Sequence, residues 1–392
     1  MIKAHKIRLN PTPEQAVYFT KAAGTARFVW NWALAEWNRQ YEAGEKPTAF
    51  KLKKQFNEIR REQFPWTWEV TKNASDQPFL DLGKAFTAFF EGLQSGKRKG
   101  RPKFKSKKRS KASFYLANDQ CELGGHRIWM PKLGWVNMAE NLRFTGKVTG
   151  ARITKTADWW FVSLTVAIPD EKPEKRPAAI GIDVGLNRLA TLSTSQGYEN
   201  QAFLRTALKK LRQANKRLHR RAKGSKNREK ARSLVARLHY RITCLRDDVL
   251  HKLTTRIADC YGIVGIEDLN LKGLFKNRRL SRSFSDAALG KLLTLLRSKV
   301  EQRGGQVIKV GRFFPSSKTC HSCAWKWEEM ELSDRVFLCQ NKSCAYYQVA
   351  QDRDHNAALC ILGEALRLIG LIDQAVDGIG SDDDVNLAVD AG

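Results

Sequence analysis

Two acidic residues end short apolar runs, where a charge is costly to bury. Asp183 ends the run 178–183 and Glu267 ends the run 261–267, and both runs have the composition of buried strands. A carboxylate in that position must be protonated, paired with a cation or bound to a metal ion. The two acids are therefore candidate metal ligands.

A third carboxylate, Asp354, stands at the start of the expected final helix, which runs to about residue 370. The small Ala357 and Ala358 that follow would let this helix approach a sheet closely. Two Mg²⁺ ions held by two to four carboxylates can activate water and stabilise a leaving oxygen in phosphodiester hydrolysis. Each acid alone is equally compatible with a turn or a helix N-cap, so the hypothesis depends on the three together.

Four cysteines form a second group with metal-ligand spacing. Cys320 and Cys323 are separated by two residues, Cys339 and Cys344 by four, and fifteen residues lie between the pairs. Two such turns can offer four thiolates to a tetrahedral Zn²⁺, which would be structural because a closed site leaves no open position for a reactant. Unmetallated thiols are the alternative, and His321 is a further possible ligand.

The acids need a sheet and helices around them. The pattern predicts a strand over 178–183 with a hairpin partner at 189–194, strands at 261–267 and 306–310, and a helix over 286–302. Leucine seams predict a helical pair between about 204 and 257, with a turn at Lys223-Gly-Ser. The outward faces of this basic helical pair carry eleven cations that either are solvated or contact nucleic acid: Lys209, Lys210, Arg212, Lys216, Arg217, Arg220, Arg221, Arg228, Lys230, Arg232 and Arg237.

The N-terminal half has a different pattern. A strand is expected over 2–9, then a capping box at Thr12 and Gln15 and a helical region to about 95. Breaks between helices are predicted at Gly24, Gly44, Pro47, Pro65 and Pro78. A basic segment, 97–111, precedes predicted strands at 113–116, 127–130 and 159–168, which would form a small β-barrel with the first strand.

Composition favours a polyanionic partner. The 392 residues have a formal net charge of +29 and 42% apolar content, so we expect a folded protein that binds nucleic acid. No apolar run approaches the roughly 18 residues of a membrane span, and the first residues lack a signal-peptide core. A cytoplasmic, nucleoid-associated protein is therefore expected.

Three motifs resemble the RuvC motifs of transposon-encoded TnpB proteins, which type V CRISPR effectors share. They are Gly181-Ile-Asp183-Val-Gly185, Gly265-Ile-Glu267-Asp-Leu269 and Asp352-Arg-Asp354-His-Asn-Ala-Ala358. Their order, the basic helical pair between them and the cysteines before the third motif also match, and the resemblance covers residues 1 to about 365. The spacing of Cys339 and Cys344 is wider than the two residues usual in that family.

The resemblance implies an α/β multidomain protein with an RNase H-like (RuvC) nuclease domain. In it Asp183, Glu267 and Asp354 would bind Mg²⁺, and a guide RNA would select double-stranded target DNA by pairing. Asp354 is preferred to Asp352 because the family's acid stands two residues before the Asn-Ala-Ala element. The expected domains are a wedge-like β-barrel (1–10 and 112–170), a helical recognition domain with the basic segment (11–111), the nuclease domain (171–316), a zinc-ribbon insertion that binds target nucleic acid (317–348), the third motif and its helix (349–370) and a disordered acidic tail (371–392).

Three other functions share parts of this pattern. A nuclease-inactive RNA-guided repressor would keep the basic channel but lose the acids, which are all present here. A DNA-strand transposase would need a nucleophilic tyrosine or a different acidic core. A compact type V CRISPR effector has the same motifs and would be told apart by its genomic neighbours.

Overall fold

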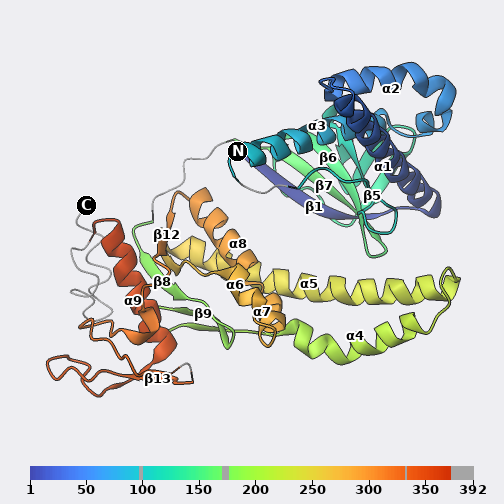
Figure 1. Ribbon diagram of the computed structural model, residues 1–392. Coiled ribbons are helices and arrows are strands. Elements are labelled where there is room, and N and C mark those ends of the chain that lie inside the picture. Colours follow the sequence, from blue (N-terminus) through green and yellow to red (C-terminus); the bar gives the residue numbers. More distant parts are fainter. Residues whose placement is uncertain (97–99, 170–175, 332, 372–392) are drawn as a thin grey trace. The chain divides into compact units, whose positions relative to one another are not determined.

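The computed structural model describes residues 1–96, 100–169, 176–331 and 333–371 of a mixed α/β protein (Figure 1). The chain divides into two compact units, Met1–Asp170 and Glu171–Gly392. The predicted acidic tail lies outside the described residues from position 372 onward. No helix in the described part of the chain is both long and apolar enough to span a membrane.

The first unit is built on a seven-stranded antiparallel sheet of order β2-β6-β7-β1-β5-β4-β3. Its strands are β1 (Ile2–Asn10), β2 (Ser113–Ala117), β3 (Glu122–Gly124), β4 (Arg127–Met130), β5 (Gly134–Met138), β6 (Lys147–Thr156) and β7 (Trp159–Ala167). One apolar core contains Phe114 of β2, at one end of this order, and Ile128 of β4, next to the other end. The sheet is therefore curved around its core. Strands β3, β5 and β6 were not predicted from the sequence, and the barrel and the domain boundaries stay predictions.

Three helices follow β1 in this unit: α1 (Pro13–Glu42), α2 (Ala49–Gln63) and α3 (Lys72–Gln94), with a 3₁₀ turn at Pro65–Glu69. The predicted capping box is confirmed, since Thr12 accepts from Gln15 N and Gln15 Oε1 accepts from Thr12 N. The predicted breaks at Gly24 and Pro78 are wrong, because both residues lie inside helices. An interior glycine costs a helix only about 1 kcal/mol. Pro78 is buried in the packed face of α3. Tertiary packing therefore outweighs the preference of Gly24 and Pro78 to end a helix.

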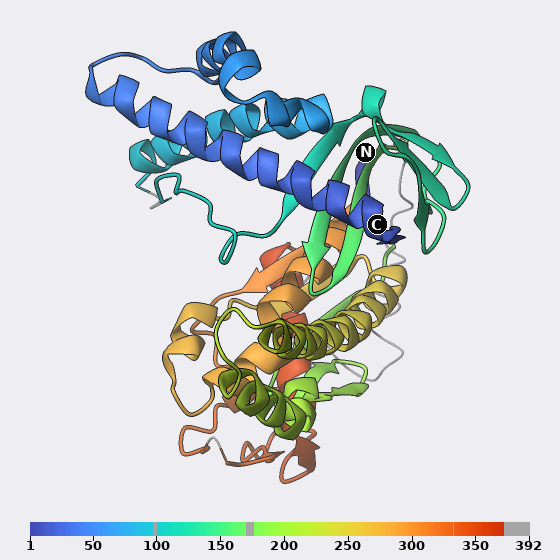
Figure 2. The same cartoon turned by 90° about the vertical axis from the view of Figure 1, so that its right-hand side faces the viewer.

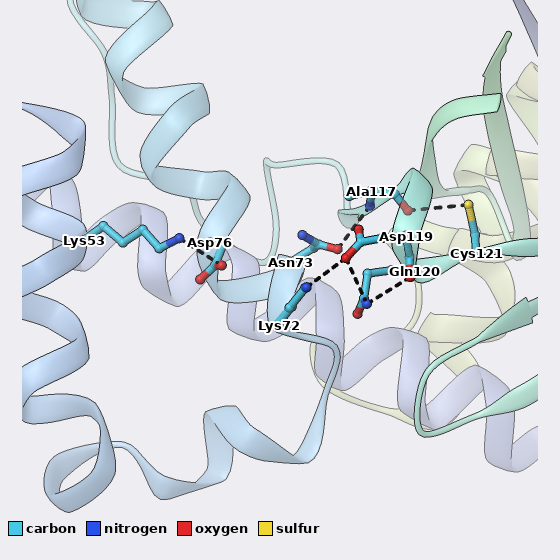
Figure 3. Close-up of polar contacts among 8 residues, drawn as sticks. All are labelled: Lys53, Lys72, Asn73, Asp76, Ala117, Asp119, Gln120 and Cys121. Carbon is cyan, nitrogen blue, oxygen red and sulfur yellow. Dashed lines mark hydrogen bonds and ion pairs between the residues drawn. The ribbon is translucent and has the colours of Figure 1, made fainter. Parts of the chain in front are cut away.

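Polar contacts fasten the start of α3 to the sheet (Figure 3). Lys72 Nζ lies 2.9 Å from Asp119 Oδ2, and Ala117 N donates to Asn73 Oδ1 over 3.1 Å. Asp119 belongs to a short 3₁₀ turn (Asn118–Gln120) that follows β2. Because the Lys72 pair is exposed, the part-buried hydrogen bond to Asn73 contributes more to the attachment.

The described part of the basic segment runs along α1. Side chains of α1 form hydrogen bonds with the main chain of this segment. Trp30 Nε1 donates to Lys103 O over 3.0 Å, and Asn31 exchanges two hydrogen bonds with the main chain of Lys105. The Lys105 ammonium lies 3.5 Å from the centre of the Trp30 ring. The segment is thus ordered along the helix from Lys103 to Lys105.

The second unit contains a five-stranded sheet of order β10-β9-β8-β11-β12. Strands β8 (Ala179–Asp183), β11 (Ile263–Glu267) and β12 (Gln306–Val310) are parallel, whereas β9 (Arg188–Leu192) and β10 (Gly197–Glu199) extend the sheet antiparallel. Its helices are α4 (Phe203–His219), α5 (Lys226–Cys260), α6 (Leu271–Lys276), α7 (Ser281–Ala287), α8 (Leu289–Gln302) and α9 (Arg353–Leu368). The helix predicted from residue 286 is interrupted at Ala288, whose φ is +52°.

Helices cover both faces of this second sheet. Ile180 and Ile182 of β8, with Val264 and Ile266 of β11, pack in one core with residues of α5 and α8. The intervening Gly181 and Gly265 face α9, since a Cβ at Gly181 would lie 2.0 Å from Ala358 O and one at Gly265 would lie 2.8 Å from Ala365 Cβ. The glycines therefore allow α9 to lie directly on the sheet.

Between β12 and α9 the chain forms a small unit that we call the cysteine module, residues 316–352 without the undescribed residue 332. It contains a 3₁₀ turn (Ser316–Lys318) and the two-stranded sheet of β13 (Val336–Leu338) and β14 (Ala350–Asp352). Its own core is built from the cysteines together with Met330 and Phe337.

Candidate active site and cysteine cluster

Strand alternation places two of the predicted acids on the face that α9 covers. Side chains two residues apart share a face of a strand, so Asp183 lies on the side of Gly181, and Glu267 on the side of Gly265. Because β8 and β11 are parallel neighbours with Ile182 opposite Ile266, the two acids leave adjacent strand ends together.

The third acid, Asp354, is brought toward Asp183 because a short stretch of strand β8 and one turn of helix α9 have nearly equal lengths. Two residues along a strand advance about 6.6 Å, and four residues along a helix advance about 6 Å. Asp183 stands two residues after Gly181, which contacts Ala358, and Asp354 stands four residues before Ala358. Asp354 in the first turn of α9 is thereby brought near Asp183, as their electrostatic interaction shows.

The charges of the three acids favour binding of a cation. Burial, and then the charges of Glu267 and Asp354, raise the pKa of Asp183 to about 7, while Arg353 opposes the rise. Three carboxylates that repel one another in a partly dehydrated site are stabilised when a dication enters. The residue types also fit, because carboxylate oxygens are the ligands that hard divalent ions prefer.

The acids do not form one closed ligand sphere. Among the described residues, the cysteine cluster alone brings three or more ligating side chains within 4.8 Å of one another. Magnesium retains several waters and is commonly bound through one or two carboxylates plus phosphate oxygens. An open set of acids at strand ends suits that mode of binding better than a closed cage.

Neighbouring residues support the acids, and sequence analysis missed the most direct of them. The Ser316 hydroxyl donates to Glu267 Oε1, and Ser316 is only 2% exposed. Asp352 is the N-cap of α9 and accepts from Asp354 N and His355 N, each over 3.0 Å. Asp268 pairs with Arg312 over 2.8 Å. The sequence signals for Ser316 were its place four residues before Cys320 and its position in the segment 313–319, which resembles the family's entry into this region.

The four predicted cysteine ligands do converge. The ligand atoms of Cys320, Cys323, Cys339 and Cys344 all lie within 4.8 Å of one another, with Sγ–Sγ distances of 3.8 Å for Cys320–Cys344 and 3.5 Å for Cys323–Cys339. The wider spacing of the second pair therefore does not prevent convergence. His321 turns away from the cluster, since its Nδ1 lies 3.0 Å from Asn356 Oδ1.

The chemistry of this cluster fits a structural metal. Burial raises the pKa of Cys320 to about 11 and also raises the pKa of Cys339. These thiols would thus be protonated without a metal, and binding a dication would release their protons. Four sulfur ligands in a closed site are typical of structural zinc.

Removing one of these thiols is expected to remove the metal. We expect Cys339→Ser to lower bound zinc from about one ion per chain to a small fraction, because three ligands hold the ion much less tightly. Elemental analysis of purified full-length protein measures the content, and thermal unfolding should begin at a lower temperature. Cys244→Ser, at an exposed position of α5, is the control, and wild-type protein purified without bound metal would contradict the expectation.

The basic helical pair forms a cation-rich surface. Helices α4 and α5 lie side by side (Figures 1 and 2), and ten of the eleven cations named from the sequence are exposed. The exception is Arg228, which is half-buried because Nη1 donates to Leu218 O and Arg221 O and closes the turn. Buried Asp286 accepts from Leu204 N and Arg205 N and pairs with Arg246, so it fixes α4 to α5.

Family comparisons cover most of the chain. A family described as a probable transposase matches residues 163–278, a Cas12f1-like TNB domain matches 290–361, and a helix-turn-helix domain matches 1–46. In that last range the structure has β1 followed by the single long helix α1.

Individual proteins resemble the chain over nearly its whole length. A putative RNA-guided DNA endonuclease of Streptomyces pristinaespiralis is 33% identical over 370 residues, which are 93% of this chain and 89% of the relative. The putative RNA-guided DNA endonuclease InsQ of Escherichia coli K12 is 29% identical, over 86% of this chain and 87% of its own. A solved Cas12f1–sgRNA–target DNA complex aligns with 92% of this chain and 99% of its own at 16% identity and a TM-score of 0.35.

Proposed function

The chain belongs to the TnpB family of RNA-guided DNA endonucleases, and we propose that it cuts double-stranded DNA beside a short adjacent motif. The proposed cutting site is the RuvC-like group of Asp183, Glu267 and Asp354 on an RNase H-like sheet. A guide RNA would choose the target by base pairing, as is general for effectors of this kind. The element that encodes the protein would be a transposon.

The observation that supports this proposal is the position of the three acids on their secondary-structure elements. Asp183 and Glu267 end neighbouring parallel strands on the face covered by α9, and Asp354 stands in the first turn of that helix. The sheet order, with a parallel half and an antiparallel half that meet at β8, is the arrangement expected of an RNase H-like domain.

The roles of the residues follow from their chemistry. Asp183, Glu267 and Asp354 would hold Mg²⁺, which supplies an activated water and neutralises the charge that develops on the phosphate during an in-line displacement. Burial and its acidic neighbours raise the pKa of Asp183 to about 7, so a bound cation would favour its ionised, ligating form. Ser316 holds one oxygen of Glu267 and leaves the other free to ligate.

The basic helical pair is proposed to contact the sugar-phosphate backbone of the RNA or of its duplex with DNA. Ten exposed cations on two connected helices and their turn match a regularly charged polyanion. A shallow groove on α4 is lined by three of these cations, Lys209, Arg212 and Lys216. Arg205, a further cation of α4, also lines it.

A plasmid library with randomised sequence beside one target tests the function. The protein is co-expressed with the RNA encoded next to its gene, and cutting in Mg²⁺ is read by sequencing the broken ends. Cutting that requires the RNA supports the proposal and reveals the adjacent motif. RNA-dependent binding without cutting would favour a repressor, and cutting without RNA would overturn the guided function.

Neutralising α4 is expected to weaken nucleic-acid binding. In Lys209→Ala/Arg212→Ala/Lys216→Ala, we expect affinity for the guide RNA to fall about tenfold or more at physiological salt, and the slope of log K against log salt to decrease by about 2 to 3. Filter binding across a salt series measures both quantities.

A matched triple variant controls for lost charge. Lys252, Lys291 and Arg297 each form an ion pair within the same unit. Replacing these three by alanine removes the same formal charge but leaves α4 intact, and it should change the salt slope little. Equal losses in the two triple variants would show that net charge alone, and not α4, governs binding.

A further inference from the structure

The cysteine module contacts the carboxylate site directly through Ser316. This residue opens the module, four positions before Cys320, and its hydroxyl donates to Glu267 Oε1. Ser316 is 2% exposed, so its hydroxyl is largely shielded from water. A hydrogen bond to one carboxylate oxygen fixes the rotation of the carboxylate and thereby the direction of its other oxygen.

A second contact joins the first cysteine pair to the helix that carries Asp354. Asn356 is fully buried, and its Oδ1 accepts from His321 N over 3.1 Å. Its Nδ2 donates to Thr319 O over 2.7 Å. Thr319 and His321 flank Cys320, whereas Asn356 stands one residue beyond His355 in the first turn of α9. The main chain around Cys320 is thus bonded to the turn of α9 that presents Asp354.

The second half of the module holds the other side of the same turn. In the β13–β14 ladder, Val336 pairs with Asp352, the N-cap of α9. Arg353 N donates to Arg335 O over 3.0 Å, and Arg353 Nη1 donates to Asp334 O over 3.0 Å. Since β13 ends at the residue before Cys339, both cysteine pairs are connected to contacts that flank Asp354.

We propose that the cysteine module positions the nuclease acids, with Ser316 and Asn356 as positioning residues. Ser316 orients Glu267, and Asn356 fixes the turn that carries Asp354. A metal on the four cysteines keeps Ser316 and the main chain around Cys320 in position to form these hydrogen bonds. Binding of a divalent ion at the acids is therefore coupled to metal binding at the cysteines, and the coupling acts in both directions. This inference rests on the proposed function of the acids.

The first test measures Mn²⁺ binding to the full-length, zinc-loaded protein without RNA, from the signal of free Mn²⁺ in electron paramagnetic resonance. Sites lost in Asp183→Asn define binding at the acids. We expect Ser316→Ala to weaken that binding about tenfold or more, as loss of an outer hydrogen bond to a metal ligand typically does. In cleavage assays the Mg²⁺ concentration for half-maximal rate should rise by a similar factor. Ser317→Ala, the adjacent hydroxyl, is the matched control.

The second test breaks the coupling from the cysteine side. Removing the cysteine metal with a chelator, or replacing Asn356 by alanine, is expected to weaken Mn²⁺ binding at the acids while the far-ultraviolet circular dichroism of the sheet and long helices persists. Wild-type Mn²⁺ affinity in both Ser316→Ala and the chelator-treated protein would overturn the inference. If wild-type protein shows no Mn²⁺ site that depends on Asp183, the proposed active site fails instead, so the two failures are distinguishable.

Discussion

Asp183→Asn is expected to reduce guided DNA cleavage by about 1,000-fold or more, while the affinities for guide RNA and target DNA stay within about threefold. The substitution removes the charge that acts as an ion ligand but keeps the size of the side chain. The charges of both Glu267 and Asp354 raise the pKa of Asp183, so Asp183 interacts with both other acids. Single-turnover cleavage at saturating Mg²⁺ gives the rate, and electrophoretic mobility shift gives the affinities.

A neighbouring acid provides the control for this variant. Asp268 follows Glu267 directly but is paired with Arg312 at 2.8 Å and Lys309 at 3.5 Å. Because its charge is already neutralised by these cations, Asp268→Asn should retain most of the cleavage rate. Cleavage by Asp183→Asn at the wild-type rate would remove Asp183 from the active site.

Gly181→Ala is expected to destabilise the second unit by at least about 3 kcal/mol, since overpacking against main chain cannot be relieved by a rotamer change. The added Cβ would lie 2.0 Å from Ala358 O and 2.6 Å from Leu362 N. For a unit of this size, the midpoint of thermal unfolding should fall by about 10 °C. Differential scanning calorimetry of the full chain resolves the transition.

Gly311→Ala is the companion control for this prediction. Nothing lies within 4 Å of a Cβ built at Gly311, which belongs to the same unit. Its stability should change by less than about 1 kcal/mol. If Gly181→Ala unfolds at the temperature of Gly311→Ala, then α9 does not lie on β8 as described, and the route that brings Asp354 to Asp183 is lost.

Local sequence patterns were enough to predict the elements that have short, distinctive motifs. The strand ending at Asp183 and the strand 306–310 were predicted within a residue of their bounds, because apolar runs between glycine or polar turns have few alternatives. The cysteine spacing predicted a cluster that the structure confirms in geometry. The interior positions of Gly24 and Pro78 were mispredicted, because packing of α1 and α3 outweighs local helix preference.

What the sequence by itself determined is the chemical inventory: three acids, four thiols, a large positive charge and the strands that end in Asp183 and Glu267. Only the tertiary structure decided how these groups meet. The first cysteine pair bonds to α9 through Asn356, and Ser316 reaches Glu267 from 49 positions away. The approach of Asp354 to Asp183 and Glu267 likewise depends on the alternation of side chains along two parallel strands, on the missing Cβ atoms of Gly181 and Gly265, and on the length of one helical turn. No local sequence pattern contains these distances.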